Sequence, residues 1–303
     1  MVRLQGEAFF DVTRNPERPF IIDAGTAEIT VLARRLDRIS EQHRYSRDFT
    51  LNSQQEALAE VIACFPVYRS YLRADGQLAA EDRHNVRLAL RRARRRNPAI
   101  DASLFAFIGS VLLQEHPEGL DEAARAERLD FTMRFQQLTG PVMAKGLEDT
   151  AHYRYHPLAS LNEVGGEPEP RGDAVERFHA GNAERRERWP RAMTATSTHD
   201  TKRDEDVRSR ISVLSEVAGS WEEALDRWRQ MNRSHKATLD ETEAPDANDE
   251  QLFYQTLVGT WPPSLGAQDP RGDYLERIQE YLRKALREAK VHTSWVSPDE
   301  AYA

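Results

Sequence analysis

The chain has 303 residues, 30% of them charged, with a net charge of −8 and a hydrophobic share of 39%. These values suit one large or two ordinary globular domains, and the negative charge offers no general attraction to nucleic acid or anionic lipid. No apolar run approaches the roughly 20 residues that span a bilayer, the amino terminus lacks a secretory signal, and a single cysteine excludes an intramolecular disulfide, so we expect a cytoplasmic protein.

The first part of the chain is predicted to form helices and one strand. Residues 1–27 match no pattern that we can place. In the helical stretch that follows, five apolar positions share one face: Ile29, Leu32, Ala33, Leu36 and Ile39. The run Val67–Leu72, between Pro66 and the turn sequence "ADGQ", predicts a short strand. We therefore expect residues 28–78 to hold helices and one strand.

Residues 79–138 are helical in pattern almost throughout, which predicts a large helical insertion. Within it, "ALRRARRRNP" carries five arginines: Arg91, Arg92, Arg94, Arg95 and Arg96. At about 100° per residue they spread around a helix instead of forming one stripe. We interpret them as a solvated helix end, with an RNA-binding patch as the alternative, and we expect no nucleic-acid partner.

Residues 139–215 alternate between short strands and helices. "TGPVMAKGLED" predicts a strand that ends in a Lys-Gly turn, and "AMTATSTHD" predicts another some fifty residues later. Such alternation builds a parallel sheet or barrel. From residue 216 to 303 helix follows helix. At the end, Ser297 and Pro298 suit the opening of a further helix, which indicates truncation from a longer parent; a frayed tail is the alternative.

Most familiar catalytic motifs are missing. The sequence has no G-x-S-x-G elbow, no Walker-type phosphate loop, no dinucleotide fingerprint, and neither H-E-x-x-H nor paired C-x-x-C. We expect no metal and no cofactor. Polar side chains at predicted strand ends remain, and an α/β barrel places its catalytic groups there.

Two groups of residues fit that position. His199 and Asp200 follow the strand "AMTATST" and precede an acidic helix start; alternatively, Asp200 caps that helix and His199 bonds a loop carbonyl. The second group comprises Lys145, Glu148, Asp149, Tyr153, Arg154 and Tyr155. Aromatic rings beside charged groups suit a sugar, whose ring faces stack while its hydroxyls take polar partners. An amphipathic helix with buried tyrosines explains the second group equally well.

At these stretches the sequence closely resembles the maltooligosyltrehalose synthase family of the α-amylase superfamily. The resemblance is carried by "RFQQLTGPVMAKGLEDTAHYRYHPLASLNEVGGEP" and "RWPRAMTATSTHDTKRDEDVRSRISVLSE", and it extends over nearly the whole chain from about Glu28. It implies a helix-dominated α/β fold, an incomplete TIM (β/α)8 barrel with a large helical insertion. In that fold the strand of residues 28–78 and those of residues 139–215 would be barrel strands.

The resemblance also implies a reaction. Members of the family are isomerases, intramolecular glucosyltransferases that convert the reducing-end α-1,4 linkage of a maltooligosaccharide to α,α-1,1 in trehalose biosynthesis. Asp200 would stabilise the transition state, with His199 as its sugar-binding neighbour. The residues implied to bind substrate are Lys202, Lys145, Glu148, Asp149, Tyr153, Arg154 and Tyr155. Among them, Lys202, Lys145 and Glu148 would belong to the family's own subsites, which hold the released glucose so that it, instead of water, attacks the glycosyl-enzyme.

The chain departs from the superfamily in one respect. The segments that carry the aspartate nucleophile, R-x-D-H, and the acid/base glutamate, resembling V-E-K-I-L, are absent. Retaining catalysis needs two carboxylates about 5 Å apart, so we expect the chain to be inactive alone and the missing upstream half of the barrel to be its partner. A related maltooligosaccharide hydrolase and a non-catalytic helical module that binds a glucan or a partner protein are the alternatives.

Overall fold

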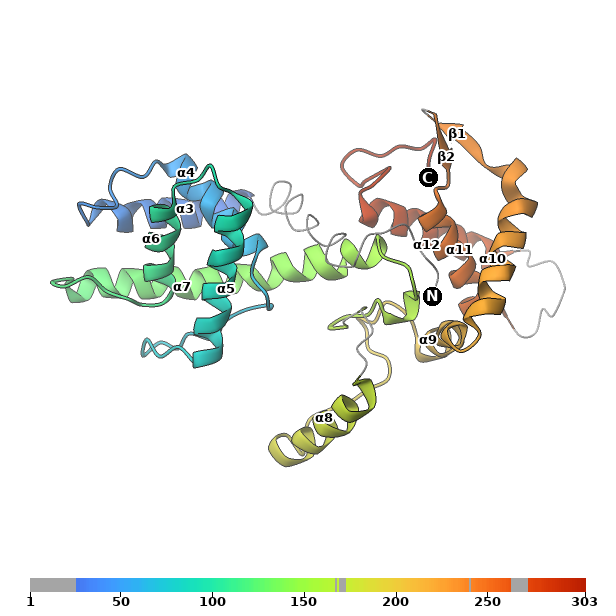
Figure 1. Cartoon of the computed structure of the whole chain (residues 1–303), viewed down its shortest axis with the longest axis horizontal. Helices are drawn as coiled ribbons and strands as arrows, with labels where there is room; N and C mark the ends of the chain where they lie inside the picture. The colour runs from blue at the N-terminus through green and yellow to red at the C-terminus, as the bar shows by residue number, and fades with distance from the viewer. Residues whose placement is uncertain (1–25, 167, 169–172, 240, 263–271) are drawn as a thin grey trace. The chain divides into compact units, whose positions relative to one another are not determined.

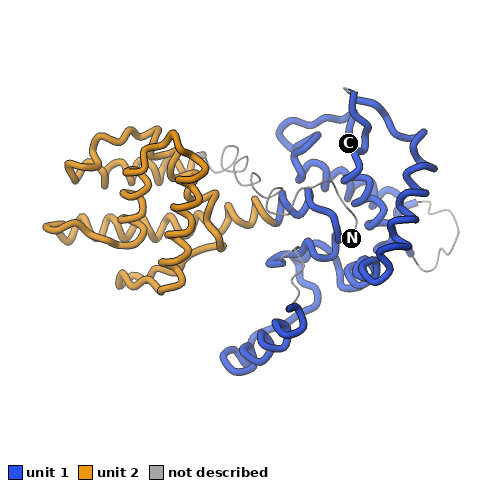
Figure 2. The backbone as a smooth tube through the Cα atoms, in the orientation of Figure 1, with its two compact units in different colours: residues 1–12, 148–303 blue, residues 13–147 orange. Residues whose placement is uncertain are grey.

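The computed structural model describes residues 26–303, apart from residues 167, 169–172, 240 and 263–271. Most of this part is helical (Figure 1). The chain divides between Leu147 and Glu148 into two compact units, called unit 2 before the division and unit 1 after it (Figure 2). Residues 1–25 of the unmatched amino-terminal segment lie outside the described residues. In the described part, no helix is both long and apolar enough to cross a membrane.

The helices of unit 2 pack around one hydrophobic core. They are α3 (Thr26–Glu41), α4 (Leu51–Ala63), α5 (Ala80–Arg96), α6 (Ala102–Leu112) and α7 (Glu122–Met143). The predicted apolar face of α3 is buried, and this helix packs against both α4 and α7. Phe131 and Phe135 of α7 are fully buried in the core, and the ring of Phe135 meets Phe65 edge-on at 5.7 Å. The single cysteine, Cys64, is buried in the same core.

Residues 67–72 form no strand, so that prediction is wrong. Side chains take the backbone groups that a neighbouring strand would use. The Leu72 N–H donates to Oε1 of Gln136 at 2.8 Å, and Nε2 of Gln136 donates to the Leu72 carbonyl at 3.2 Å. The Tyr71 N–H donates to Oδ2 of Asp82 at 3.1 Å. Because these buried groups are already paired, the segment is stable as an irregular connection.

The predicted strand in "TGPVMAKGLED" is a helix instead. α7 continues past Pro141 to Met143, and a π-helical turn, Ala144–Glu148, follows it. A short apolar run has no periodicity that separates a buried strand from a buried helix. Val142 is buried in the same core as Phe135, and each further residue extends an existing helix without a new nucleation cost. The neighbouring turns therefore decide the conformation here.

Unit 1 consists of short helices and one small sheet. After two 3-10 turns, Ala151–Tyr153 and Ala159–Leu161, its helices are α8 (Ala174–Arg188), α9 (Glu205–Ser212), α10 (Ala218–Asn232), α11 (Ala247–Thr260) and α12 (Asp273–Ala289), with further 3-10 turns at Val213–Ser215 and Arg233–His235. The strands β1 (Ala237–Leu239) and β2 (Thr242–Ala244) pair antiparallel. One core joins α9, α10 and α11 through Ile211, Leu225 and Tyr254, and a second joins Tyr153 to α11 and α12.

The segment "AMTATSTHD", predicted as a strand, is not helical and belongs to no sheet. Residues 192–196 are exposed, Met193 to 95%. The carbonyl of Thr196 accepts a hydrogen bond from the Arg208 guanidinium. Within the described residues β1 and β2 form the only sheet, so no adjacent parallel strand is present to pair with this segment. The predicted parallel strands are therefore absent from this part of the chain.

The end of the chain also differs from the prediction. No helix starts at Ser297. Instead Oδ1 of Asp299 accepts from the N–H groups of Ala301 at 2.9 Å and Tyr302 at 3.2 Å. This aspartate satisfies the local backbone donors in a turn, which removes the need for helical hydrogen bonds.

Candidate functional site

The loop from Ser197 to Arg203 presents two candidate residues to solvent. His199 and Asp200 are exposed, and neither side chain makes a hydrogen bond or ion pair within the described part of the chain. The loop is held locally by Thr201, whose hydroxyl donates to the Thr198 carbonyl at 2.9 Å. The cap residue of α9 is Asp204, so the interpretation of Asp200 as a helix cap is wrong. The Asp200 carboxylate is therefore available to an external ligand.

Lys202, from the same loop, joins residues that lie about fifty positions away. Its Nζ donates to Oδ1 of Asp149 at 2.7 Å and lies 5.5 Å from the centre of the Tyr153 ring. The lysine side chain is only 14% exposed and the aspartate 29%, so solvent screens this pair less than a surface ion pair. The structure thus brings together three of the predicted substrate-binding residues.

Glu163 anchors the backbone of this loop. Its Oε1 accepts from the Lys202 N–H at 2.7 Å and its Oε2 from the Arg203 N–H at 3.3 Å. The Arg203 guanidinium in turn donates to the Ala159 carbonyl at 3.1 Å and to the Tyr281 hydroxyl of α12 at 2.7 Å. Sequence reasoning missed these anchoring roles. The only available signal was an acid two positions before the Gly165-Gly166 pair.

Arg154 and Glu148 have internal partners. The Arg154 guanidinium donates to the carbonyls of Ala289 and Lys290 at the end of α12, where a helix leaves carbonyls without helical partners. Glu148 is buried and accepts from the Gly165 N–H at 3.3 Å. Arg154 therefore fixes the position of α12, and Glu148 that of the glycine turn.

The two remaining candidate residues are Lys145 and Tyr155. Lys145 is exposed in the π-helical turn and belongs to unit 2. Tyr155 is half-buried, and its carbonyl accepts from the side-chain amide of Asn162. Asn162 is buried and also donates to the His152 carbonyl at 2.9 Å. The Asn162 amide therefore holds the 152–155 segment in place, and Asn162 itself directly precedes Glu163.

Two buried histidines lie behind the site. Burial, and secondarily the positive charge of Lys202, lowers the pKa of His152 to about 4. Burial lowers the pKa of His156 to about 3, assisted by the Arg203 charge. Burial also raises the pKa of the Tyr153 phenol. All three groups are therefore neutral near pH 7, and the charges that act on Tyr153 include those of Lys202, Asp149, Arg203 and Glu288.

Acidification should destabilise unit 1. Both histidines have an unfolded pKa near 6.5 and a lower folded pKa, so the unfolded chain binds more protons as pH falls below 6.5. Between pH 7 and 5, each histidine should lower the unfolding free energy by roughly 2 kcal/mol. Burial raises the pKa of Asp249 to about 6, so its protonation should raise the unfolding free energy by roughly 1 kcal/mol over the same range. Urea unfolding followed by tryptophan fluorescence at both pH values measures the net loss.

A variant and a control locate the cause. His152→Gln should reduce the net loss from roughly 3 to roughly 1 kcal/mol, because one histidine no longer contributes and the gain at Asp249 offsets about half of the loss from the other. Leu252→Ala, in the neighbouring core, should lower stability by about 2–5 kcal/mol at both pH values and leave the difference between them unchanged. An unaltered pH difference in His152→Gln would show that this histidine is not the source.

One group of side chains in the described part could hold a metal ion. Ligand atoms of Asp246, Asp249 and His292 lie within 4.8 Å of one another. Oδ1 of Asp246 already caps α11, its Oδ2 lies 2.8 Å from Nε2 of His292, and the Tyr302 hydroxyl donates to Asp249 at 2.7 Å. Hydrogen bonds thus use these ligand atoms, and we assign no metal to them.

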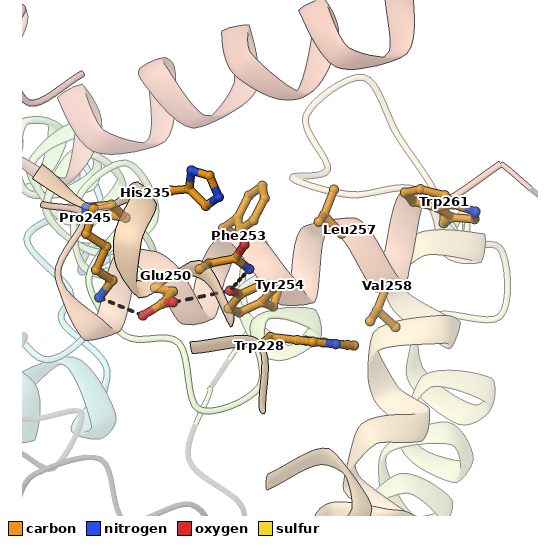
Figure 3. A pocket seen from close by; sticks show the side chains of 11 residues that line it. Trp228, His235, Pro245, Glu250, Phe253, Tyr254, Leu257, Val258 and Trp261 are labelled. Atoms are coloured by element: carbon orange, nitrogen blue, oxygen red, sulfur yellow. Dashed lines mark hydrogen bonds and ion pairs between the residues drawn. The ribbon is translucent and has the colours of Figure 1, made fainter. Parts of the chain in front are cut away.

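Unit 1 also contains an aromatic cavity of about 670 Å³ beside α10 and α11 (Figure 3). Its apolar wall comprises Trp228, Pro245, Phe253, Tyr254, Leu257, Val258 and Trp261. At one end, Nζ of Lys236 lies 2.9 Å from the Glu250 carboxylate, and the Asn232 amide donates to the Tyr254 hydroxyl at 2.9 Å. Ring faces with a few polar groups at one end can hold a ring-shaped ligand.

The chain is similar to known proteins in sequence and in fold. No family model matches the chain. A protein of Mycobacterium tuberculosis described as a putative maltooligosyl trehalose synthase is 44% identical over 181 residues, which are 59% of this chain and 22% of that protein. The solved maltooligosyltrehalose synthase of Arthrobacter ramosus matches 98% of this chain with a TM-score of 0.72 and 30% identity. A hypothetical maltooligosyl trehalose synthase of Sulfolobus tokodaii matches 99%, with a TM-score of 0.66 and 26% identity.

The match covers only part of each relative. The chain spans 22% of the curated relative and 33–34% of these two solved structures. In sequence and in fold, the chain is similar to a portion of proteins described as maltooligosyltrehalose synthases.

Proposed function

We propose that this chain is a portion of an intramolecular transglucosylase that converts the reducing-end α-1,4 linkage of maltooligosaccharides to α,α-1,1. One observation carries the proposal. A single loop presents His199 and Asp200 to solvent while Lys202, two positions later, is fixed against Asp149. An available carboxylate beside a fixed donor–acceptor pair suits a reaction in which a charged sugar forms next to a held glucose.

The residues would divide the work in the following way. Asp200 would stabilise the positive charge of an oxocarbenium-like transition state, and His199 would bind neighbouring hydroxyls. Lys202 and Asp149 would offer one donor and one acceptor to the released glucose. Its orientation toward the glycosyl-enzyme would favour reattachment over attack by water. The nucleophile and the acid/base would come from polypeptide that this chain lacks, so the chain alone would be inactive.

We also propose that residues 192–198 become a barrel strand when that polypeptide is present. Supporting this, the segment lacks regular hydrogen bonds to a neighbour and is exposed although it is rich in threonine, which favours strands. An added strand would supply the missing ladder and would place His199 and Asp200 at its carboxyl end.

A chimera tests the function. Residues 28–303 would replace the matching third of the Arthrobacter ramosus synthase, and the product would be incubated with maltopentaose. Isomerisation removes reducing ends without releasing glucose, whereas a hydrolase increases both. We expect loss of reducing ends with the chimera and no change with the isolated chain. A folded chimera that only releases glucose would support the hydrolase instead, and turnover by the isolated chain would reject the requirement for a partner.

Lys202→Ala in that chimera should raise the ratio of hydrolysis to isomerisation. Loss of one charge-assisted hydrogen bond to the acceptor glucose is worth about 1.5–3 kcal/mol, or roughly tenfold or more in the ratio. Glucose release and trehalosyl product would be quantified together by chromatography. Lys284→Ala, on the exposed surface of α12, is the matched control and should leave the ratio as it was. An unchanged ratio in Lys202→Ala would contradict an acceptor-binding role.

A non-catalytic glucan-binding module is the second candidate, and the aromatic cavity favours it. In that case maltooligosaccharide binding by the isolated chain, measured by calorimetry, would survive Asp200→Ala and be lost in Trp228→Ala. Supplying the remaining two thirds of a synthase would then add no turnover.

A further inference from the structure

A second hollow, of about 790 Å³, lies in unit 2 where α5 ends and α6 begins. Four arginines line it: Arg91, Arg92, Arg94 and Arg95. At about 100° per residue these positions spread over roughly 160° of the helix, and all four nevertheless line the one hollow. Arg96 is outside the hollow, with a guanidinium nitrogen 3.5 Å from Sγ of Cys64.

Four arginines of unit 2 that lie outside the hollow pair with carboxylates. These pairs join Arg35 and Arg134 to Asp130, Arg38 to Glu127, and Arg87 to Glu115, at 2.6–3.6 Å. Within the described residues, none of the four guanidinium groups lining the hollow makes a hydrogen bond or an ion pair. The carboxyl terminus of a helix stabilises nearby cations only weakly. The positive charges of the four side chains repel one another, and an anion bound between them would relieve that repulsion.

The rest of the hollow restricts the size of that anion. Its apolar lining comprises Leu88, Pro98, Ala99, Ile100 and Ala102. Asp101 also lines it, but this carboxylate accepts from the Ser103 N–H at 2.8 Å and caps α6. From Arg91 to Arg95 the helix rises only about 6 Å. Nucleic acid commonly engages a longer track of six to ten phosphates, and the chain as a whole carries a charge of −8.

We propose that this hollow binds a compact polyanion with two or three linked phosphate groups. Guanidinium groups pair with phosphate oxygens in a bidentate manner, and four of them within one and a half turns match the charge of a di- or triphosphate. The site is separate from the residues assigned to sugar chemistry, so it stands independently of the proposed transglucosylase function.

Calorimetry on the whole 303-residue chain at low salt tests the proposal, with inorganic tripolyphosphate as the probe. We expect saturable one-to-one binding in the micromolar range, and binding of inorganic phosphate at least tenfold weaker. The double variant Arg91→Gln/Arg95→Gln should weaken tripolyphosphate binding at least tenfold. The matched control Arg47→Gln/Arg73→Gln removes the same charge from exposed positions of the same unit and should change it less than twofold. Circular dichroism would verify that both variants fold.

Three results would overturn the proposal. The first is absence of tripolyphosphate binding at millimolar concentration. The second is an equal loss of affinity in both double variants, which would indicate a general charge effect. The third is tighter binding of a 12-nucleotide single-stranded RNA than of tripolyphosphate, lost in Arg91→Gln/Arg95→Gln, which would favour nucleic acid as the ligand.

Discussion

Asp200→Asn should lower the turnover of a complete, active synthase that contains this chain by roughly a thousandfold, while its fold and its affinity for maltopentaose change little. The carboxylate is exposed and has no partner in the described part of the chain, so the protein does not depend on it for stability. An amide of the same shape cannot offset positive charge that develops on the sugar. Removing one preorganised electrostatic group from an active site costs about 10²–10³ in rate. Single-turnover kinetics would separate this chemical step from substrate binding.

Asp204→Asn is the matched control for that experiment. Asp204 is also exposed, lies four positions along the same segment, and caps α9 without a side-chain hydrogen bond. Its amide variant should retain activity within a factor of about two. If Asp200→Asn keeps near-normal turnover, or if both variants lose activity alike, the transition-state role of Asp200 is rejected.

Phe135→Ala should lower the unfolding free energy of unit 2 by about 3–5 kcal/mol. This side chain is fully buried, and its ring packs edge-on against Phe65 at the centre of the core. Removal of the ring loses its transfer free energy and leaves a cavity that rigid helices on all sides cannot close. Urea unfolding followed by far-ultraviolet circular dichroism would report the loss of helix at a lower urea concentration.

The tryptophans provide an internal reference for this variant. All five follow residue 148, so their fluorescence reports on unit 1, whose cores share no residue with the core of Phe135. We expect the fluorescence transition to shift less than the dichroism transition. Leu225→Ala, buried in unit 1, should reverse that order. A shift of less than 1 kcal/mol in Phe135→Ala would show that the unit 2 core tolerates the cavity.

The amino-acid sequence by itself determined the helical pattern of the chain and its resemblance to the maltooligosyltrehalose synthases. The 3.6-residue period of α3 predicted its buried face because helix geometry is local and repeats along the chain. Long unusual strings around Lys145 and Asp200 pointed to the maltooligosyltrehalose synthases, and the relatives found by sequence and by fold agree. The candidate residues could be named for the same reason, since they lie within those strings.

Tertiary structure decided the backbone conformation and the hydrogen-bond partners of each predicted strand. The three predicted strands failed because a strand is completed by a neighbour, which the sequence of the segment does not contain. At Leu72 the Gln136 side chain takes the hydrogen bonds that a neighbouring strand would make. The segment "TGPVMAKGLED" became helical because α7 continues through it. Within the described residues no strand adjoins residues 192–198. Only the folded chain could bring Lys202 to Asp149 across 53 positions or gather four arginines around one hollow, because such distances depend on packing between elements and not on periodicity within one.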